Sequence, residues 1–431
     1  LSYDLPSTMP TDNILLLPVD ILVYIFMTLR PCDLRNLMLT CRFLYDFIKN
    51  DTRIWRSISH DFIIIQDDVD SSRSYQSWYN RCRRAHNWHC GCYKNKSIVR
   101  HCTNYMPWLT YHDSEHLLYT VGSEIFCCRS DSKGIPNCSK HLWKINVPTI
   151  LRQDVRTNDI SRFVFKNKVL VCGNRDGCVA VYKVNSTTKR PKLMCHIKDC
   201  HNDGQAEVSA VEVFESRDQL SVVSCSSHSR DLFSILFPKT FNLFFNAAFS
   251  MFKFSISNVQ ISNGTGAKCL AMNEMVNQLA VGMNGNSRPL LLDVNNVHPR
   301  QVIRDIQWHD HNTLVYVTHS GFLELLDARS HEVAFRVRDP FQSSLYCVKT
   351  DGDNGIMVGS AEYSRCVLFD ARTNAHHIQM YFTQRNTSPV YCLAFDSNKL
   401  ISAVDRGISA LSFNIDYSAT KQRDYSRHVF K

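Results

Sequence analysis

The sequence predicts a mainly β protein in which a small helical module precedes an array of repeated short strands. Apolar side chains have helical spacing in residues 13–62, whereas residues 63–106 are irregular and polar. From residue 107 to residue 415, short apolar runs alternate with Gly, Asn, Asp and Ser, a pattern typical of strands joined by turns. We therefore expect four parts: a helical module at 13–60, a linker at 61–106, a β domain at 107–415 and a flexible tail at 416–431.

The first region contains enough apolar periodicity for three short helices. On the first helix, apolar residues recur every four positions, at Leu17, Ile21, Ile25 and Leu29. We expect Pro31 to end this helix and Asp33 to cap a second one, whose apolar face runs from Leu34 to Ile48. A third short helix is expected to follow, capped by Asp51 or Thr52.

Three helices this short bury little apolar surface among themselves, so their second apolar face needs a cover. Another protein can provide that cover, or the β domain of the same chain can provide it. The residues of the helices alone favour neither alternative.

The β domain carries an internal repeat. Three runs end in an apolar residue followed by Asp: LLLDV at 290–294, LELLDARS at 323–330 and VLFDART at 367–373. The last two runs are nearly identical, and Asp327 and Asp370 lie 43 residues apart. A period of about 40–45 residues with several strands in each unit is typical of a WD-type β-propeller. Six units are clear and a degenerate seventh lies at 208–236, so we expect seven blades.

A Phe-rich stretch at 232–256 interrupts the repeat pattern. A membrane-spanning helix needs about 20 nearly uninterrupted apolar residues, and this stretch is broken by Pro238, Lys239 and Lys253. We expect sheet strands with an insertion between them, and no membrane span.

Composition limits the class of protein. The chain has 431 residues, of which 44% are hydrophobic and 21% charged, as in a folded globular protein. Several of the 18 cysteines lie inside apolar runs, which indicates buried thiols and a reducing compartment, the cytoplasm or the nucleus. No secretory signal is expected at the N-terminus. The net charge of +9 is mild for this length, and a nucleic-acid-binding role lacks a basic run with aromatic residues among it.

The helical region resembles an F-box. The matching residues are Leu17-Pro18-Val19-Asp20-Ile21-Leu22, Ile25-Phe26, Leu29, Asp33-Leu34, Leu37, Thr40-Cys41-Arg42, Leu44-Tyr45 and Trp55. Together with the repeats, they resemble the F-box/WD class of substrate receptors in Skp–cullin–F-box ubiquitin ligases. One member is resembled most closely, through Asn87-Trp88, Gly91-Cys92, Met106-Pro107-Trp108, Ser344-Leu345-Tyr346-Cys347, Thr350-Asp351-Gly352 and Ser388-Pro389-Val390-Tyr391-Cys392-Leu393.

The resemblance implies that the F-box binds a Skp-type adaptor linked to a cullin scaffold. The propeller then presents a protein substrate for ubiquitination and proteasomal degradation, without catalysis by this chain. The adaptor-binding residues that we expect are Leu17, Pro18, Ile21, Leu22, Ile25, Leu29, Leu34, Leu37 and Cys41. Some of these residues must instead form the core of the module itself.

Substrate recognition is expected on the propeller. Receptors of this kind commonly use the rim of the central channel, and several bind phosphorylated motifs through arginine clusters. The candidates near turns and strand ends are Arg175, Arg304, Arg365 and Arg406. Arg329 and Arg372 also qualify, but both follow a repeat Asp, so a structural or solvated role is the alternative for them.

No motif indicates a metal, a cofactor or catalysis. A group of potential zinc ligands comprises His86, His89, Cys90, Cys92, His101 and Cys102, but its spacing differs from that of paired structural ligands. Nucleophile-elbow, phosphate-loop and zinc-protease motifs are not found in the sequence. We expect a non-catalytic protein. The alternative function is a propeller scaffold unrelated to ubiquitination, and binding of a Skp-type adaptor distinguishes the two.

Overall fold

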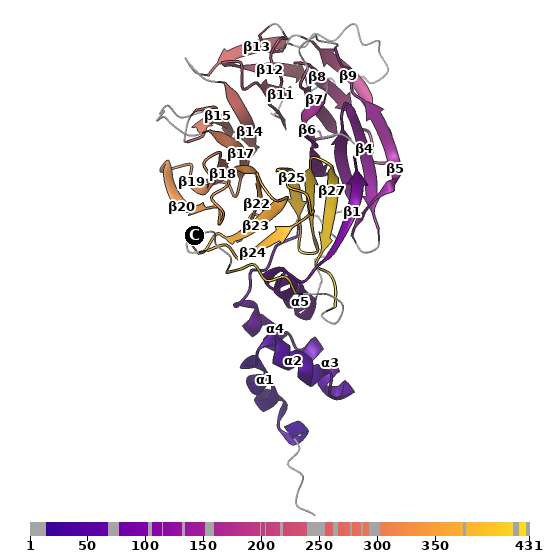
Figure 1. Ribbon diagram of the computed structural model, residues 1–431, viewed down its shortest axis with the longest axis vertical. Helices are drawn as coiled ribbons and strands as arrows, with labels where there is room; N and C mark the ends of the chain where they lie inside the picture. Colours follow the sequence, from indigo (N-terminus) through magenta and orange to yellow (C-terminus); the bar gives the residue numbers. More distant parts are fainter. Residues whose placement is uncertain are drawn as a thin grey trace, which may run out of the picture. The chain divides into compact units, whose positions relative to one another are not determined.

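The computed structural model forms two compact units (Figure 1). The first unit contains residues 1–64 and 72–86, and the second contains residues 65–71 and 87–431. The structure describes residues 14–67, 77–101, 106–113, 115–131, 134–150, 159–198, 200–202, 204–215, 219–238, 255–261, 266–275, 278–285, 288–292, 302–373, 376–416 and 422–427.

The first unit is helical. Its elements are a 3-10 turn η1 (Ile14–Leu16) and the helices α1 (Val19–Met27), α2 (Pro31–Met38), α3 (Arg42–Asn50) and α4 (Thr52–Ser59), followed by the first part of α5 (Trp78–His89). Asp51 caps α4 as predicted, accepting a hydrogen bond from the Arg53 backbone N–H at 2.9 Å.

The second predicted helix is wrong, because the structure has two helices in its place. Pro31 is the first residue of α2, where its missing N–H is harmless, and Arg30 rather than Asp33 is the N-cap. The break comes after Leu39, where the Thr40 hydroxyl donates to the Leu37 carbonyl at 2.7 Å and Cys41 is extended.

A single apolar core holds the helices of the first unit together. Leu34, Ile48 and Ile54 are fully buried in it, and Cys82 of α5 packs against the same cluster. The Trp55 indole N–H donates to the Ile48 carbonyl at 2.7 Å, which satisfies the one polar atom of this buried ring.

The second unit is a seven-bladed β-propeller, as predicted (Figure 1). Blade 1 is β2 (Leu109–Tyr111), β3 (His116–Val121), β4 (Glu124–Ser130) and β5 (Pro136–Asn146). Blade 2 is β6 (Ile160–Lys166), β7 (Val169–Asn174), β8 (Val179–Lys183) and β9 (Lys192–Ile197). Blade 3 is β10 (Ala210–Glu215), β11 (Gln219–Cys225), β12 (Asp231–Pro238) and β13 (Ser255–Gln260). Blade 4 has three described strands, β14 (Ala267–Asn273), β15 (Gln278–Met283) and β16 (Leu290–Leu291).

The last three blades complete the ring. Blade 5 is β17 (Ile303–Trp308), β18 (Thr313–Thr318), β19 (Phe322–Asp327) and β20 (Glu332–Arg338). Blade 6 is β21 (Leu345–Thr350), β22 (Gly355–Ser360), β23 (Arg365–Asp370) and β24 (Gln379–Phe382). Blade 7 is β25 (Val390–Phe395), β26 (Lys399–Val404), β27 (Gly407–Ser412) and β1 (Lys94–Arg100).

Blade 7 closes the ring by joining strands from both ends of the domain. Strand β1 pairs antiparallel with β27, from Lys94 opposite Ser412 to Arg100 opposite Gly407, and Figure 1 shows the two side by side. The prediction that residues 63–106 are irregular is therefore wrong, since α5 and β1 lie within them. Strand β1 is mostly exposed, so it lacks the apolar alternation by which strands are recognised.

Two residues near the end of α5 are anchored on blade 7 and the segment that follows it. The Trp88 ring stacks on Phe413 with ring centroids 3.5 Å apart, and its indole N–H donates to the Ser397 carbonyl at 3.0 Å. The Asn87 amide donates to the carbonyls of Phe413 and Ile415 at 2.7 and 3.0 Å. These contacts fix the start of the second unit against the end of the same unit.

The predicted flexible tail is also wrong in part, because residues 422–427 pack on blade 6 and its surroundings. The Tyr425 N–H donates to the Gln379 side-chain carbonyl at 2.8 Å, and the Tyr425 ring meets Phe382 edge-on at 5.0 Å. The Arg423 N–H donates to the Gly91 carbonyl at 3.2 Å. Polar composition suggested a free end, but backbone hydrogen bonds and one aromatic side chain hold the segment.

We expect Gly91→Ala to release this segment. Gly91 has a φ of +63°, and a Cβ there would overlap the backbone carbonyl oxygen of Arg423. The loss of stability should be about 1–2 kcal/mol, and hydrogen exchange in residues 422–427 should accelerate. Gly352→Ala is the matched control, because its φ is +77° but its Cβ would meet the nearest backbone at an ordinary 3.5 Å. Equal acceleration in both variants would contradict the proposed contact.

The Phe-rich stretch begins and ends as strands. Strand β12 pairs with β13 from Asp231 opposite Gln260 to Leu236 opposite Ser255, as expected for blade strands. The expected insertion falls in residues 239–254, outside the described residues. Within the part of the chain that the structure describes, no helix is long and apolar enough to cross a membrane.

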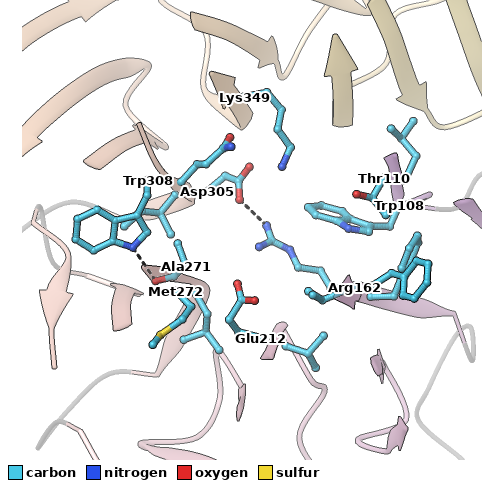
Figure 2. Close-up of a pocket in the computed structure, with 17 residues that line it drawn as sticks. Trp108, Thr110, Arg162, Glu212, Ala271, Met272, Asp305, Trp308 and Lys349 are labelled. Atoms are coloured by element: carbon cyan, nitrogen blue, oxygen red, sulfur yellow. Dashed lines mark hydrogen bonds and ion pairs between the residues drawn. The ribbon is translucent and has the colours of Figure 1, made fainter. Parts of the chain in front are cut away.

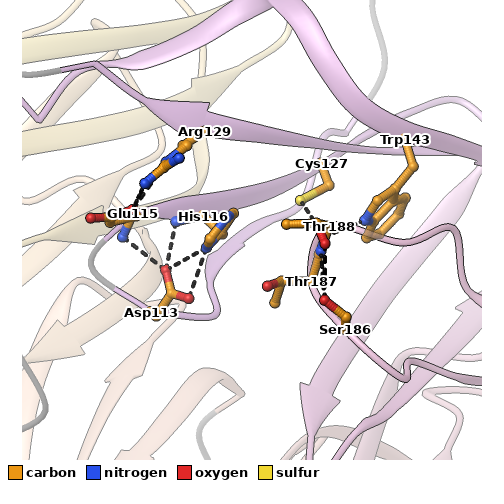
Figure 3. Close-up of polar contacts among 9 residues, drawn as sticks. All are labelled: Asp113, Glu115, His116, Cys127, Arg129, Trp143, Ser186, Thr187 and Thr188. Atoms are coloured by element: carbon orange, nitrogen blue, oxygen red, sulfur yellow. Dashed lines mark hydrogen bonds and ion pairs between the residues drawn. The ribbon is translucent and has the colours of Figure 1, made fainter.

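Polar contacts join blade 1 to blade 2 and stiffen one edge of blade 1 (Figure 3). The Trp143 indole N–H donates to the Thr187 carbonyl at 2.7 Å, so a strand of blade 1 is fixed to a loop of blade 2. At the start of β3, the Asp113 carboxylate accepts hydrogen bonds from the His116 backbone N–H and from its ring, at 2.7 and 2.8 Å.

A buried histidine makes propeller stability depend on pH. His201 is 2% exposed, its Nε2 lies 3.0 Å from the Ser224 hydroxyl, and its Nδ1 has no hydrogen-bond partner among the described residues. Burial lowers the pKa of His201 to about 4, against about 6.5 in the unfolded chain. Neutral His201 therefore supports folding fully above about pH 6.5, and this contribution is lost as the pH falls towards about 4.

We expect a loss of about 2 kcal/mol in the free energy of unfolding between about pH 7.5 and about pH 5. Denaturant unfolding at several pH values measures it. His201→Gln should flatten this part of the profile, and an unchanged slope in that variant would assign the pH dependence to other groups.

Candidate protein-binding surfaces

Helix α1 is apolar on both sides. Leu22, Val23 and Phe26 face the core and are 1–4% exposed. On its outer side, Ile21 is 48% and Tyr24 is 72% exposed, one turn apart on the same face. An apolar helix that is covered on one side only leaves a surface that another molecule can bury.

The first unit exposes many more large apolar side chains besides these two. Ten of the fifteen exposed large hydrophobic side chains in the described residues lie between residues 14 and 45. They are Ile14, Leu16, Leu17, Val19, Ile21, Tyr24, Met27, Leu39, Phe43 and Tyr45, which we call the apolar surface of the helical unit. Such a concentration distinguishes this unit from the propeller, where exposed apolar side chains are scattered.

The predicted adaptor residues divide into three groups. Leu17, Pro18, Ile21 and Cys41 are exposed, and Ile25, Leu29 and Leu37 are half-buried. Leu22 and Leu34 are corrections, because they are 1% and 0% exposed and belong to the core of the helical unit. They support the surface from below and cannot touch a partner directly.

Helix geometry explains why the predicted adaptor-binding residues did not include all of the exposed apolar side chains of α1. Positions spaced by four drift by about 40° at each step around a helix of 3.6 residues per turn. The stripe from Leu17 through Ile21 and Ile25 to Leu29 therefore turns from the exposed side into the half-buried side. Tyr24, three residues after Ile21, lies on the outer face and was not recognised.

The two edges of the propeller carry different arginines. We call the edge with the turns between second and third strands the 2–3 edge; the first strand of each blade also starts there. Arg175 lies between β7 and β8, Arg406 lies between β26 and β27, and Arg304 is near the start of β17, so all three lie at the 2–3 edge. Arg329 and Arg372 follow third strands and lie at the opposite edge, paired with Asp327 and Asp370.

Arg365 is a correction to the predicted substrate site. It begins β23 at the 2–3 edge but is fully buried. Its guanidinium donates to the Asp339 carboxylate at 2.7 Å and to the Ser360 hydroxyl at 2.8 Å, and it lies 4.2 Å from the Phe341 ring centroid. Arg365 is thus a structural residue that joins blade 6 to the preceding loop.

Strand bulges shape the rim of the channel at the 2–3 edge. In five blades the first strand shifts register at its second residue, which is left unpaired with the neighbouring strand. A bulge redirects the side chain of the unpaired residue. The five residues are Ser161, Lys268, Arg304, Tyr346 and Tyr391. These positions could not be predicted from the sequence, because a bulge is defined by the register with the neighbouring strand.

Cations and aromatic rings meet at this rim. The Arg304 guanidinium lies 2.9 Å from His319 Nδ1 and 5.1 Å from the Tyr346 ring centroid. Burial lowers the pKa of Lys268, and the nearby positive charges of Arg304 and Arg162 lower it further, against the opposing effect of Glu207. Arg304 and Arg162 thus bring positive charge close to Lys268, whose ammonium is also 3.9 Å from the Glu207 carboxylate.

Inside the channel lies a cavity of about 320 Å³ (Figure 2). The Arg162 guanidinium of blade 2 and the Asp305 carboxylate of blade 5 form an ion pair across it at 2.9 Å. Arg162 also lies 4.3 Å from the Trp108 ring centroid, and Asp305 accepts from the Val348 N–H at 3.0 Å. The pair fixes opposite sides of the channel, and its charges compensate one another. In Figure 2 Glu212 also points into this space, and burial raises the pKa of its carboxyl group.

Metal binding finds no support in the part of the chain that the structure describes. There, no group of three or more His, Cys, Asp or Glu side chains could hold a metal ion. Cys102, one of the potential ligands in the sequence, lies outside the described residues.

Comparisons with known proteins agree with both units. The F-box-like family matches residues 14–61. The crystal structure of the C-terminal WD40 domain of Sif2 is similar with a TM-score of 0.51 and 13% identity, covering 74% of this chain and 98% of that domain, which concerns the fold alone. The chain thus combines an F-box-like domain with a WD40-type propeller, the composition of an F-box/WD-repeat protein.

A particular protein is also matched along nearly the whole chain. The mouse and human F-box/WD repeat-containing protein 4 are 23% and 24% identical over 413 residues, which is 92% of this chain and 92% of each relative. The chain is homologous to this protein, dactylin, the member that its linker and later repeats resemble. An F-box implies a Skp-type adaptor as a partner, and a WD40 propeller implies protein binding.

Proposed function

We propose that the chain is the substrate-recognition subunit of a Skp–cullin–F-box ubiquitin ligase. The single observation that carries this proposal is the apolar surface of the helical unit, which lies within the F-box-like residues 14–61. A soluble protein that exposes many large apolar side chains on one small unit has a binding partner for them. In an F-box that partner is the Skp-type adaptor, through which the cullin scaffold joins.

The contacts of α1 indicate how the adaptor binds. Leu22 and Phe26 anchor the helix to its own core, so the helix presents Ile21 and Tyr24 without first reorganising. A preformed surface saves the entropy of ordering these side chains on binding. Apolar anchors of this kind dominate the binding energy of an interface. We therefore assign direct adaptor contact to the exposed predicted residues Leu17, Pro18, Ile21 and Cys41, with Ile25, Leu29 and Leu37 at the margin.

We place the substrate site at the 2–3 edge of the propeller. Arg304 and Lys268 give this rim a positive character, and Tyr346 and Tyr391 add aromatic surface, with rings 5.8 Å apart. Guanidinium groups bind carboxylates and phosphates well, so an acidic or phosphorylated segment of a substrate suits the rim. Arg175 and Arg406 extend the same edge.

The chain then acts by position and not by chemistry of its own. Holding the substrate and the ligase machinery in one assembly raises the effective concentration of the substrate near the activated ubiquitin. The proposed product is a ubiquitinated substrate directed to the proteasome. We propose the cytoplasm or the nucleus as the compartment, because a reducing environment suits the many buried thiols of the chain.

Affinity purification with mass spectrometry tests the function. The intact chain and a variant lacking residues 13–60 are purified from cells under proteasome inhibition. The Skp-type adaptor and the cullin should be lost from the variant, and proteins retained by both are substrate candidates. If the intact chain captures proteins but never the adaptor, the alternative of a scaffold unrelated to ubiquitination replaces the proposal.

A separate experiment tests the substrate site. It compares arginine substitutions at the 2–3 edge with arginine substitutions at the opposite edge, which serve as the control. Replacing Arg175 and Arg304 with Ala should weaken binding of the retained proteins by about 30-fold, since two lost charged contacts of about 1 kcal/mol each cost about 2 kcal/mol together. Replacing Arg329 and Arg372, at the opposite edge, should leave recovery unchanged. Equal losses in both variants would place the substrate elsewhere.

A further inference from the structure

Two thiols of blade 1 are in contact. Cys128 in β4 and Cys138 in β5 have their sulfur atoms 3.3 Å apart, on neighbouring strands of one sheet. A disulfide bond is about 2.05 Å long, so a movement of about 1.3 Å would join them. The register of the two strands shifts on both sides of Cys128. A bulge of this kind interrupts the regular ladder and leaves room for such a movement.

The two thiols differ in exposure and environment. Cys128 is fully buried, whereas Cys138 is half-buried. The hydrogen bond from Cys128 lowers the pKa of Cys138, against the opposing effect of burial, and a hydrogen bond from Tyr119 and the positive charge of Lys96 in β1 lower it further. The pKa of Cys128 is raised, by its hydrogen bond to Cys138 and by burial. Cys138 is the more exposed of the two thiols and the one whose pKa is lowered, so we expect it to supply the thiolate, the form that reacts with oxidants.

We propose that Cys138 and Cys128 form a modification site for hydroperoxides, which convert the two thiols into a disulfide. The Cys138 thiolate attacks the outer oxygen of the peroxide, the O–O bond breaks, and Cys138 becomes a sulfenic acid. The other oxygen leaves as hydroxide or alkoxide and takes up the proton that the Cys138 thiol had released, which gives water or an alcohol. The Cys128 thiol then attacks the sulfenic sulfur, the S–S bond forms, and a water molecule leaves with the Cys128 proton. In total, two thiols are oxidised and one peroxide is reduced.

The modification acts on the place where the propeller ring closes. Cys128 belongs to an apolar cluster that packs blade 1 against Cys392, Ile401 and Ile408 of blade 7. A disulfide between β4 and β5 would hold this side of the cluster in place. It would also reduce the conformational entropy of the unfolded chain, which favours the folded state. We expect the oxidised protein to have a higher midpoint of thermal unfolding than the reduced protein. This inference is independent of the proposed ligase function.

Peptide mapping of the full-length chain under non-reducing conditions provides the test. After treatment with a small excess of hydrogen peroxide and blocking of free thiols, trypsin cuts at Arg129 and Lys133, between the two cysteines. The disulfide should therefore link two separate peptides and reduce their combined mass by two hydrogen atoms. Peroxide that leaves both thiols open to alkylation would overturn the proposal.

Three variants separate the two steps. Cys138→Ser should abolish the linked peptides, and Cys128→Ser should instead accumulate a sulfenic acid at Cys138 that dimedone traps. Cys195→Ser is the matched control, because Cys195 is a half-buried cysteine on β9, the outer strand of blade 2. It should form the disulfide like the unaltered chain. Oxidation of Cys128 at an undiminished rate in Cys138→Ser would show that Cys138 is not the reactive thiol.

Discussion

Ile21→Asp is expected to abolish co-purification of the Skp-type adaptor, with a loss of affinity on the order of 100-fold or more. Ile21 is 48% exposed on the outer side of α1, so the substitution places a carboxylate in water in the free chain. In the complex the same carboxylate would be buried against an apolar partner, where an unpaired charge is strongly unfavourable. The effect therefore falls on binding and spares folding, and pull-down with purified adaptor measures it.

Leu142→Asp is the matched control for this variant. Leu142 is 38% exposed and lies in β5 of the propeller, far from the F-box-like residues in the sequence. It should retain the adaptor fully. Thermal unfolding of both variants checks that each is folded. An Ile21→Asp chain that is folded and still binds the adaptor would remove the basis of the ligase proposal.

Asp339→Ala is expected to destabilise the propeller by about 3–5 kcal/mol, because it leaves the buried positive charge of Arg365 without a counter-charge. Both side chains of this ion pair are 0% exposed, and their charged atoms lie 2.7 Å apart. The Asp339 carboxylate also accepts hydrogen bonds from the N–H groups of Phe341 and Ser343, at 2.9 and 3.0 Å. Its removal leaves two backbone N–H groups without this acceptor and the buried guanidinium without a counter-charge, with only the Ser360 hydroxyl as acceptor, and denaturant unfolding measures the loss.

Two further variants interpret this result. The double variant Asp339→Leu with Arg365→Met removes both charges and should recover much of the stability, since apolar replacements of buried ion pairs are often tolerated. Arg372→Ala, which breaks a half-exposed pair at the opposite edge, should lose no more than about 1 kcal/mol. If Asp339→Ala kept full stability but lost substrate, Arg365 would be a binding residue as the sequence suggested.

The repeat pattern predicted the propeller because each blade repeats local information. Asp327 and Asp370 end equivalent third strands, and each accepts the N–H of an arginine two residues later at 2.9 Å. This short-range turn is written in the sequence and recurs with the blade. The same holds for the F-box pattern, whose apolar spacing defines helices over one or two turns.

Features that depend on distant partners escaped prediction. Strand β1 is recognisable only through β27, more than 300 residues later in the chain. Residues 422–427 pack against Gln379 and Gly91, and their polar sequence carries no mark of that contact. The sequence around Arg365 predicts a surface cation, because nothing in it shows that Asp339 and Ser360 pair with the guanidinium in the interior. Burial and pairing between residues this far apart in the sequence are determined by the complete fold, so local sequence patterns do not predict them.

Because β1 pairs with β27, the propeller ring can close only after nearly the whole domain has been synthesised. A ribosome delivers β1 early and β27 near the end, so the nascent ring stays open for most of translation, with an unpaired strand that chaperones must shield. A premature stop just before residue 407 would remove only a small part of the length. It would nevertheless leave every preceding blade in a ring that cannot close, and quality control would treat the product as unfolded.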